Sequence, residues 1–389
     1  MKPINYAFQN ISSSDVNAVI KTVKSQFLTQ GPKVLEFETK IAKKVNANFA
    51  VAVNSASSAL HLACLALDVG VGDWVWTTPN TYVASANCAI HCGAQIDFVD
   101  IDPFTYNMNV DLLYSKLKKS KSLNKLPKVV IPVHFAGQPC DMVSIYKLSK
   151  EFGFKIIEDA SHAIGSQYNK IKVGSCRHSQ ITVFSFHPVK IITTGEGGML
   201  LTNKKEISEK LIRLRTNGVT NKKKFMRLTK TENQIWNYQQ IELGFNFRLT
   251  EIQATLGISQ LKRLEKFLYD RYKVVQYYNK HLKDLPIILP NQTPGNYSSY
   301  HLYPVRLKLK ELKKSQKEIF RFLKKKNINA NLHYPPLHLH PFYKAMGFKK
   351  NDFREAEKYH KEVVTLPLYS GLKKNQLSYI VKVLAEAFR

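Results

Sequence analysis

The stretch FSFHPVKIITTGEGGML, residues 184–200, decides the fold class and indicates where the chemistry of this 389-residue chain lies. It contains the end of an apolar, β-prone run, ITVFSF (181–186), followed by His187 and a single lysine, Lys190. A Gly-Glu-Gly-Gly turn (195–198) comes next. A strand that ends in one lysine beside a glycine-rich turn holds that amine at a site instead of exposing it to solvent. The surrounding segments must show which kind of site.

Short apolar strands alternate with helical patterns on both sides of this stretch. The strands expected before it are NFAVAVNS (48–55), DWVWTTP (73–79), AQIDFVD (94–100), KVVIPVHFAG (128–137) and FKIIEDASHAIG (154–165). Strands that alternate with helices, and that read as continuous apolar runs, indicate a mostly parallel sheet covered on both faces. We therefore expect an α/β fold.

The chain is longer than one hydrophobic core usually needs, so a large and a small domain are expected. From about Thr250 a long helical stretch leads to a second region that holds HLYPVRLKL (301–309) and INANLHY (328–334). We predict an N-terminal segment and large domain over residues 1–255. A linking helix and a smaller C-terminal α/β domain are predicted over 256–389.

The net charge is +29, from 58 basic and 29 acidic residues, yet no lysine or arginine occurs between Val45 and Ser115. A basic balance can indicate nucleic-acid binding. Here the lysines are scattered among acidic residues in helix-like segments such as LKLKELKKSQK (307–317), and no helix-turn-helix, RRM or zinc-finger pattern occurs. We expect a solvated basic surface, no nucleic-acid partner, and a field that favours anionic substrates.

The sequence supports neither a membrane protein nor a metal-binding protein. No run of 18 or more apolar residues occurs, and the first residues, MKPINYAFQN (1–10), lack the apolar core of a signal peptide. We expect a cytoplasmic protein without membrane association. The five cysteines form no C-x-x-C pair, so buried free thiols and no metal are expected.

Polar residues follow several of the expected strands, at the edge where parallel sheets bind ligands. Asn54 and Ser55 follow the first strand, Asp159 ends another, and Ser185 and Lys190 belong to the opening stretch. The carboxyl ends of parallel strands meet at one edge of the sheet. We therefore expect these side chains to converge on one site.

The cofactor class follows from what the chain lacks and what it holds. No G-x-G-x-x-G follows the first strand, as a dinucleotide site would need, and no G-x-x-x-x-G-K-[ST] occurs, as a nucleoside triphosphate site would need. The third class, pyridoxal phosphate (PLP), needs a lysine, a carboxylate, a phosphate cradle and a stacking group. Lys190 can form the Schiff base and Asp159 can pair with the pyridinium nitrogen. The helix that opens at Ser55-Ala56-Ser57 suits the phosphate, and Tyr82 can stack on the ring.

Each of these residues also has a plainer interpretation. A single lysine is usually a surface residue, an aspartate such as Asp159 often caps a turn, and NSASSAL (54–60) alone is a helix N-terminus. It is their joint placement at strand ends that favours PLP.

Three motifs resemble one known family. EDASHAIGS (158–166), SFHPVKIITTGEGG (185–198) and GFNFRLTEIQATLG (244–257) are similar to the signatures of the DegT/DnrJ/EryC1/StrS sugar-nucleotide aminotransferases. LTQGPKVLEFE (28–38) and HYPPLHL (333–339) match the family in order and spacing. The resemblance covers almost the whole chain. It implies PLP fold type I, which is the aspartate-aminotransferase fold, and a homodimer with shared active sites.

The resemblance also implies site residues. Lys190 would form the Schiff base and move the proton, Asp159 would hold the pyridinium, and His162 would support the cofactor. Phosphate contacts would come from Ser185, the Ala56-Ser57 backbone and, across the dimer, Asn246, whose plainer reading is a turn residue. Tyr82 would stack where many members carry Phe or Trp. The positions that would line the substrate pocket are Tyr6, Gln26, Phe27, Leu28, Thr29, His187, Asn331, Leu332, His333 and Tyr334.

Within the family, INYAFQN (4–10), NSASSAL and SSYHLYPVRL (298–307) are most similar to members that act in pseudaminic acid biosynthesis. This likeness implies a transaminase (EC 2.6.1.-) that converts a UDP-linked 4-keto-6-deoxy-N-acetylhexosamine into its 4-amino sugar with L-glutamate. Another nucleotide-linked 4-keto or 3-keto sugar is the alternative. The cation-rich segment 220–242 has no assigned role.

Two rivals differ in chemistry. Related PLP-dependent sugar dehydratases carry histidine in place of the lysine, and Lys190 argues against that reaction. A basic nucleic-acid-binding protein that keeps PLP as a sensor is a remote alternative. His333, His338 and His340 form a cluster that we interpret as pocket wall rather than as a metal site.

Overall fold

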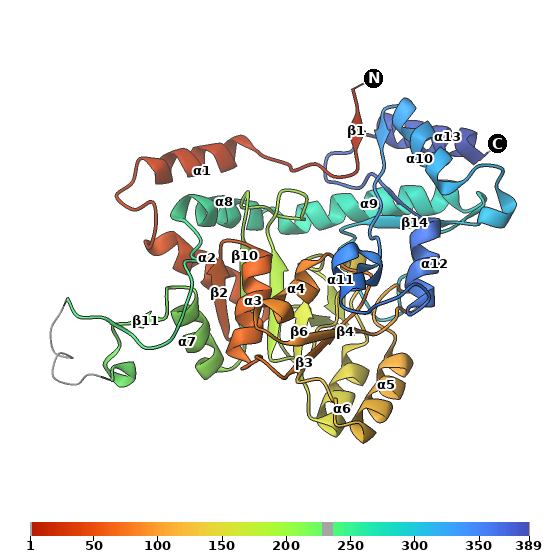
Figure 1. Ribbon diagram of the computed structural model, residues 1–389. Coiled ribbons are helices and arrows are strands. Elements are labelled where there is room, and N and C mark those ends of the chain that lie inside the picture. The colour runs from red at the N-terminus through yellow and green to blue at the C-terminus, as the bar shows by residue number, and fades with distance from the viewer. Residues whose placement is uncertain (1, 228–235, 389) are drawn as a thin grey trace.

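A computed structural model describes residues 2–227 and 236–388, and its centre is a seven-stranded sheet (Figure 1). The strand order is β2-β10-β9-β6-β5-β3-β4, and β10 alone runs against the other six. These strands are β2 (Phe49–Val53), β3 (Trp74–Thr77), β4 (Gln95–Phe98), β5 (Val129–Val130), β6 (Lys155–Asp159), β9 (Ile181–Ser185) and β10 (Gly198–Thr202). The predicted α/β class with a mostly parallel sheet is confirmed.

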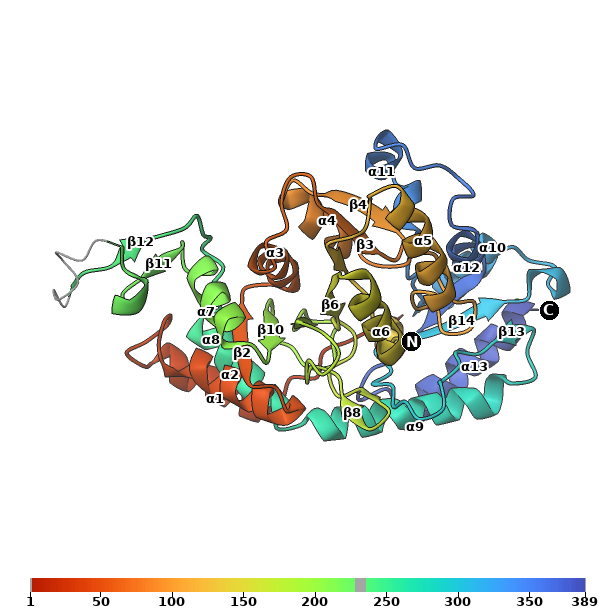
Figure 2. The same cartoon turned by 90° about the horizontal axis from the view of Figure 1, so that it is seen from below.

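Helices cover both faces of this sheet (Figures 1 and 2). They are α1 (Ser13–Val23), α2 (Pro32–Val45), α3 (Ala56–Ala66), α4 (Ala84–His91), α5 (Val110–Ser122), α6 (Met142–Phe152), α7 (Lys205–Leu214) and α8 (Glu251–Leu261). The faces differ because side chains alternate along each strand. In β6, Ile157 packs in the core beneath α3 and α4, whereas Ile156 packs in the core beneath α5 and α6. Asp159 therefore shares the side of α3 and α4, and Glu158 the opposite side.

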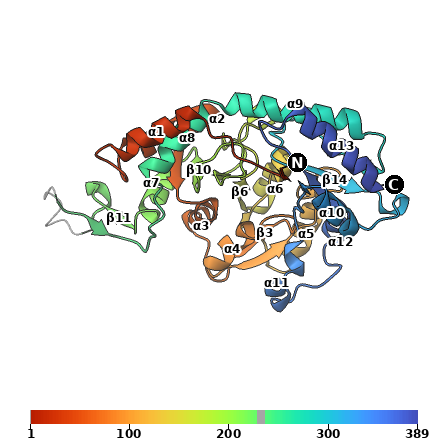
Figure 3. The same ribbon diagram turned by 90° about the horizontal axis from the view of Figure 1, so that it is seen from above.

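A second core lies beside the first, and α9 (Leu264–Leu282) runs along both (Figure 3). A three-stranded antiparallel sheet and two helices build it, together with a parallel pair that joins the N-terminus to the late chain. The strands are β13 (Ile287–Ile288), β14 (Tyr303–Leu307) and β16 (Val363–Leu366), the helices are α10 (Gln316–Lys325) and α13 (Lys374–Phe388), and the pair is β1 (Ile4–Asn5) and β15 (Ile328–Asn329).

Packing crosses the domain boundary predicted at 255/256, which remains a prediction. Ile4 belongs to the second core, although it begins the chain. Conversely, Tyr343 in α11 (Pro341–Ala345) and Tyr359 in α12 (Arg354–Glu362) pack in the core of the large sheet. The first and last parts of the chain thus each cross over to the other core.

Two small hairpins complete the described strands. One pairs β7 (Gln167–Tyr168) with β8 (Ile171–Lys172). The other pairs β11 (Val219–Thr220) with β12 (Gln239–Gln240) and extends away from the large sheet (Figures 1 and 2). It carries the described parts of the basic segment 220–242, whose residues 228–235 lie outside the described residues. In the described ranges, no helix combines the length and the apolar character that a membrane span needs.

Gly198 lets three chain segments meet at the edge of the sheet. As the first residue of β10 it pairs with Val53 of β2 and with Ser185 of β9. A Cβ at this position would lie 2.5 Å from the carbonyl oxygen of Ser55 and 2.7 Å from the amide nitrogen of Ala56. Only glycine therefore allows β10 to approach the turn that opens α3.

We predict that Gly198→Ala lowers the free energy of unfolding by about 1–3 kcal/mol, because the new methyl group must push the turn before α3 away from β10. Chemical denaturation of the variant and the parent protein measures the difference. Gly70→Ala is the control, since a Cβ at Gly70 meets nothing within 4 Å. Equal stabilities for the two variants would contradict the prediction.

Candidate active site

A cavity of about 530 Å³ lies at the edge where β2, β6 and β9 end. Its walls come from the turns after these strands, from the start of α4, and from residues near the N-terminus and in the late chain. Most of the residues predicted from sequence line it: Tyr6, Ala56, Ser57, Tyr82, Asp159, His162, Ser185, His187, Lys190, Asn331, Leu332, His333 and Tyr334. Of the polar residues expected to converge, Ser55, Asp159, Ser185 and Lys190 line the cavity, whereas Asn54 does not.

Lys190 follows β9 within a turn that two threonines hold. The Thr193 hydroxyl donates to the carbonyl oxygen of Phe186 over 2.9 Å, and the Thr194 N–H donates to the same oxygen over 3.0 Å. Within the described ranges, the Lys190 amine forms no hydrogen bond or ion pair. Removal from water lowers the pKa of this amine to about 8, and the nearby charge of Asp159 opposes that shift. The ammonium form therefore still predominates at neutral pH, but far more of the amine is neutral than for a lysine with the ordinary pKa of 10.5.

Asp159 is buried at the end of β6, and its orientation is fixed by two donors. The Ser85 hydroxyl donates to Oδ2 over 2.6 Å, and the Ser161 N–H donates to Oδ1 over 3.1 Å. The Ser85 hydroxyl lies 2.8 Å from the hydroxyl of Thr81, in the loop before α4. Sequence reasoning missed Ser85 and Thr81, because nothing in TYVASAN (81–87) indicates which helix face meets β6.

The start of α3 offers the phosphate cradle that PLP needs. The Ser55 hydroxyl caps the helix by accepting the Ser58 N–H over 3.1 Å, and the side chains of Ser57 and Ser185 line the same part of the cavity. The first N–H groups of a helix have no partner within it and attract anions. A side chain at Gly198 would collide with this turn. The residues present therefore fit a phosphorylated pyridine aldehyde.

Neutral imidazoles form the wall beside Lys190. His162 accepts the Ala136 N–H at Nδ1 over 3.3 Å, so its proton lies on Nε2, which is 3.3 Å from the Tyr334 hydroxyl. Burial, with the Lys190 charge, puts the pKa of His162 well below its usual value and lowers that of His333 to about 3. These rings serve as hydrogen-bonding groups rather than as cations.

His301 is a further wall residue that sequence reasoning missed. Its ring lies 4.4 Å from that of His162, and its Nδ1 is buried without a hydrogen-bond partner in the part of the chain that the structure describes. The segment SSYHLYPVRL contains it, but only the fold brings that segment next to the end of β6.

Comparison with known proteins identifies the family. Residues 9–385 match the family model of the DegT/DnrJ/EryC1/StrS aminotransferases. The chain belongs to this aminotransferase family. The family predicted from the three motifs is thereby confirmed.

Two sequence relatives show the range of similarity to this aminotransferase. An uncharacterized protein of Methanocaldococcus jannaschii is 38% identical, over 95% of this chain and 94% of its own length. The UDP-4-amino-4,6-dideoxy-N-acetyl-beta-L-altrosamine transaminase of Campylobacter jejuni is 34% identical, over 97% of this chain and 95% of its own length.

Solved structures are similar over nearly the whole chain. Helicobacter pylori PseC, an aminotransferase involved in the biosynthesis of pseudoaminic acid, has a TM-score of 0.90 at 30% identity and covers 100% of this chain and 99% of its own. Spr1654 from Streptococcus pneumoniae, in its PMP form, has a TM-score of 0.88 at 30% identity and covers 99% and 98%. The same protein is also known in a PLP form. PLP is the cofactor of this family, so the cofactor predicted from sequence is confirmed.

Several predicted site residues lie outside the cavity of the single aminotransferase chain. Residues 26–29 belong to the loop between α1 and α2, where Phe27 is 46% and Leu28 is 48% exposed. Asn246 is exposed and forms a β-bridge with Thr216. Tyr82, in contrast, does line the cavity, although it is 61% exposed. The roles predicted for residues 26–29 and Asn246 therefore stay predictions, which need a second subunit.

The interpretation of the late histidines as pocket wall holds for one of three. His333 lines the cavity, whereas His338 is buried elsewhere with its Nε2 2.9 Å from the Glu357 carboxylate. His340 does not line the cavity either, and its Nε2 lies 3.4 Å from the carbonyl oxygen of Pro335. The spacing misled because a short 3-10 turn, Leu337–Leu339, directs the later rings away. Among the described residues, no group of His, Cys, Asp or Glu could hold a metal ion.

We predict that the rate at which PLP attaches to the apo-aminotransferase rises with pH and levels off, with a midpoint near pH 8. Only the neutral Lys190 amine is a nucleophile, and its pKa is about 8. Asp159→Asn should move this midpoint to lower pH, because it removes the charge that favours the ammonium form. Stopped-flow absorbance measures both midpoints, and an equal or higher midpoint in the variant would contradict the assignment.

Proposed function

We propose that this aminotransferase converts a UDP-linked 4-keto-6-deoxy-N-acetylhexosamine into its 4-amino sugar, with L-glutamate as the amino donor, in pseudaminic acid biosynthesis. The observation that carries the proposal is the Lys190 amine, which lines the cavity with Asp159, has a lowered pKa, and forms no hydrogen bond or ion pair with the described residues. The 34% identity to the Campylobacter jejuni transaminase supports the choice of sugar.

The residues that would hold the cofactor line the cavity at the ends of β6 and β9 and at the start of α3. We assign Lys190 to covalent attachment, Asp159 to the pyridine nitrogen, and Ser57 and Ser185 with the start of α3 to the phosphate. When bound, PLP supplies an aldehyde for amine exchange and a ring that accepts electrons from the reacting carbon. Asp159 suits its role because its two donors leave the carboxylate no freedom to turn away.

Lys190 Nζ is assigned as the base of both half-reactions. Once displaced from the cofactor by the incoming amine, Lys190 would take a proton from the α-carbon of glutamate, whose amino group stays with the cofactor when water releases 2-oxoglutarate. In the second half-reaction it would deliver a proton to C4 of the sugar as that carbon receives the amino group and its keto oxygen leaves as water. A pKa near 8 suits this exchange, because the amine can both gain and lose a proton near neutral pH. The turn fixed by Thr193 and Thr194 keeps Nζ at the cavity in both steps.

The substrate end of the cavity is assigned to Tyr6 and to residues 331–334. Asn331 is tied to the second core, since its N–H donates to the Thr365 carbonyl oxygen over 3.1 Å. The neutral rings of His162 and His333 offer hydrogen bonds to sugar hydroxyl and amide groups without adding charge. The strongly basic surface favours the approach of a nucleotide diphosphate.

The proposal also covers the oligomeric state, the location, the partners and the domain division of the protein. We infer a homodimer in which Asn246 and residues 26–29 complete the partner's site, because these residues are exposed and do not line the cavity of their own chain. We retain a cytoplasmic location, no nucleic-acid partner and no membrane association. The division into residues 1–255 and 256–389 is retained as well.

We predict that Lys190→Ala and Lys190→Arg lower kcat by at least about 10³-fold, because Lys190 is the one lysine among the described residues that line the cavity. A glutamate-coupled assay with the keto sugar measures turnover. Lys283→Ala, which removes an exposed lysine, is the control and should retain the parent rate. Substantial turnover by Lys190→Ala would refute the role of this residue.

The substrate is tested by comparing sugars side by side. We expect UDP-4-keto-6-deoxy-L-AltNAc to be aminated with the highest kcat/KM, followed by its D-xylo epimer, and GDP-linked 4-keto sugars to be poor substrates. Mass spectrometry of the products, with and without glutamate, identifies each amino sugar. A higher kcat/KM for the epimer or for a GDP-linked or 3-keto sugar would replace the proposed substrate with that one.

A further inference from the structure

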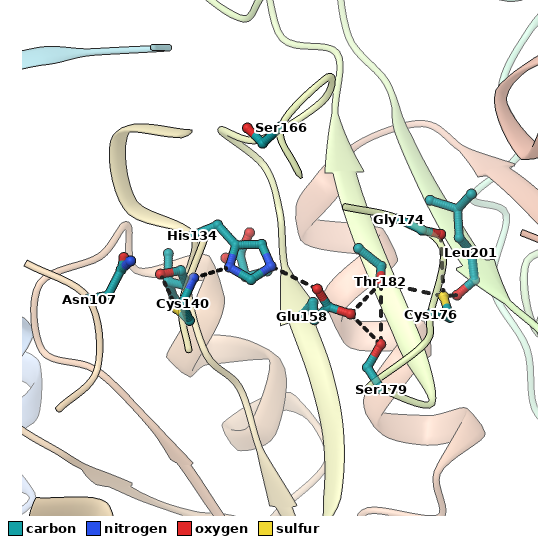
Figure 4. Close-up of polar contacts among 12 residues, drawn as sticks. Asn107, His134, Cys140, Glu158, Ser166, Gly174, Cys176, Ser179, Thr182 and Leu201 are labelled. Carbon is teal, nitrogen blue, oxygen red and sulfur yellow. Dashed lines mark hydrogen bonds and ion pairs between the residues drawn. The ribbon is translucent and has the colours of Figure 1, made fainter. Parts of the chain in front are cut away.

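A buried polar network lies on the side of the sheet that α5 and α6 cover, away from the Asp159 side chain, and Figure 4 shows its contacts. At its centre is Glu158, the residue before Asp159 in β6. Its Oε2 accepts a hydrogen bond from the His134 imidazole over 2.8 Å. Its Oε1 accepts from the hydroxyls of Ser179 over 2.5 Å and Thr182 over 3.0 Å.

The Glu158 carboxylate is ionised and has a donor for each oxygen. Burial alone would raise its pKa, but the hydrogen bonds from His134, Ser179 and Thr182 lower it below the usual value. A buried charge is tolerated only when it is hydrogen-bonded in this way. The carboxylate therefore has one well-defined position.

His134 connects this carboxylate to the strand end that carries Asp159. Its ring Nδ1 accepts the Cys140 N–H over 3.1 Å, so the ring proton lies on Nε2 and is donated to Glu158. Its main-chain N–H donates to the carbonyl oxygen of Asp159 over 3.0 Å. One residue thus holds the side chain of Glu158 and the main chain of Asp159.

The turn that His134 begins also positions a second group of the cavity. Ala136, two residues later, donates its N–H to Nδ1 of His162 and accepts the His301 N–H at its carbonyl oxygen over 2.9 Å. Asn107 fixes the turn from outside, because its side-chain oxygen accepts the N–H of the residue after His134 over 2.9 Å. A displacement of His134 would therefore be transmitted to His162 as well as to Asp159.

We propose that His134 is a positioning residue for the cofactor site. Its hydrogen bond to Glu158, on the other face of the sheet from Asp159, fixes where the side chains of Asp159 and His162 lie relative to PLP. The inference rests on the proposed role of Asp159 and adds how that side chain is held.

The test compares His134→Phe with a matched control. His338 is an equally buried imidazole with its Nε2 2.9 Å from a buried glutamate, Glu357, and neither residue lines the cavity. His338→Phe therefore removes the same kind of pair at another place in the protein. Asp159→Asn is the reference for a direct change at the cofactor. Glu158→Gln, which keeps the side-chain shape, is measured alongside in case His134→Phe does not fold.

Three quantities are measured: the dissociation constant of PLP from the apo-protein, the absorption maximum of bound PLP, and Tm. We expect His134→Phe and Glu158→Gln to weaken PLP binding by about ten-fold and to shift the absorption band in the same direction as Asp159→Asn. His338→Phe should lower Tm by a similar amount. Its dissociation constant for PLP should stay within two-fold of the parent value, and its absorption band should not shift.

Two results would overturn the inference. If His134→Phe and Glu158→Gln match His338→Phe in cofactor affinity and absorption, the network is merely structural. If Asp159→Asn itself leaves the absorption band unchanged, the proposed role of Asp159 fails, and the inference fails with it. These outcomes are distinguishable because the first leaves the Asp159→Asn shift intact.

Discussion

The withdrawal of one lysine amine from water, opposite a buried carboxylate, is the constraint on which the rest of the site depends. Burial disfavours the ammonium form of Lys190, whereas Asp159 favours it, and the balance leaves the pKa at about 8. An amine in this state can bond to a carbonyl carbon and can exchange protons near neutral pH. The aminotransferase reaction needs both properties from the same atom.

The scaffold maintains this arrangement by dividing its polar groups between the two faces of one sheet. Alternation along β6 places Asp159 on the side of the cavity and Glu158 on the other side, within a separate set of donors. The single reversed strand, β10, brings Gly198 against the turn before α3 and so joins the phosphate cradle to the lysine strand. The chemistry on one face thus depends on hydrogen bonds made on both.

The main site residues were predictable because they stand at strand ends, a place that sequence patterns can locate. Lys190, Asp159 and Ser185 follow apolar runs, and the structure places all three at one cavity. Ser85 and His301 were not predictable, since helix rotation and the packing of the late chain bring them there. Neither could one sequence show that residues 26–29 lie away from the cavity of their own chain.

Borohydride reduction of the holoenzyme, followed by peptide mass mapping, tests the central claim most directly. The account predicts one stable phosphopyridoxyl adduct, located on Lys190, and its loss in Lys190→Arg. An adduct on any other lysine, or none at all in a protein that binds PLP, would contradict it.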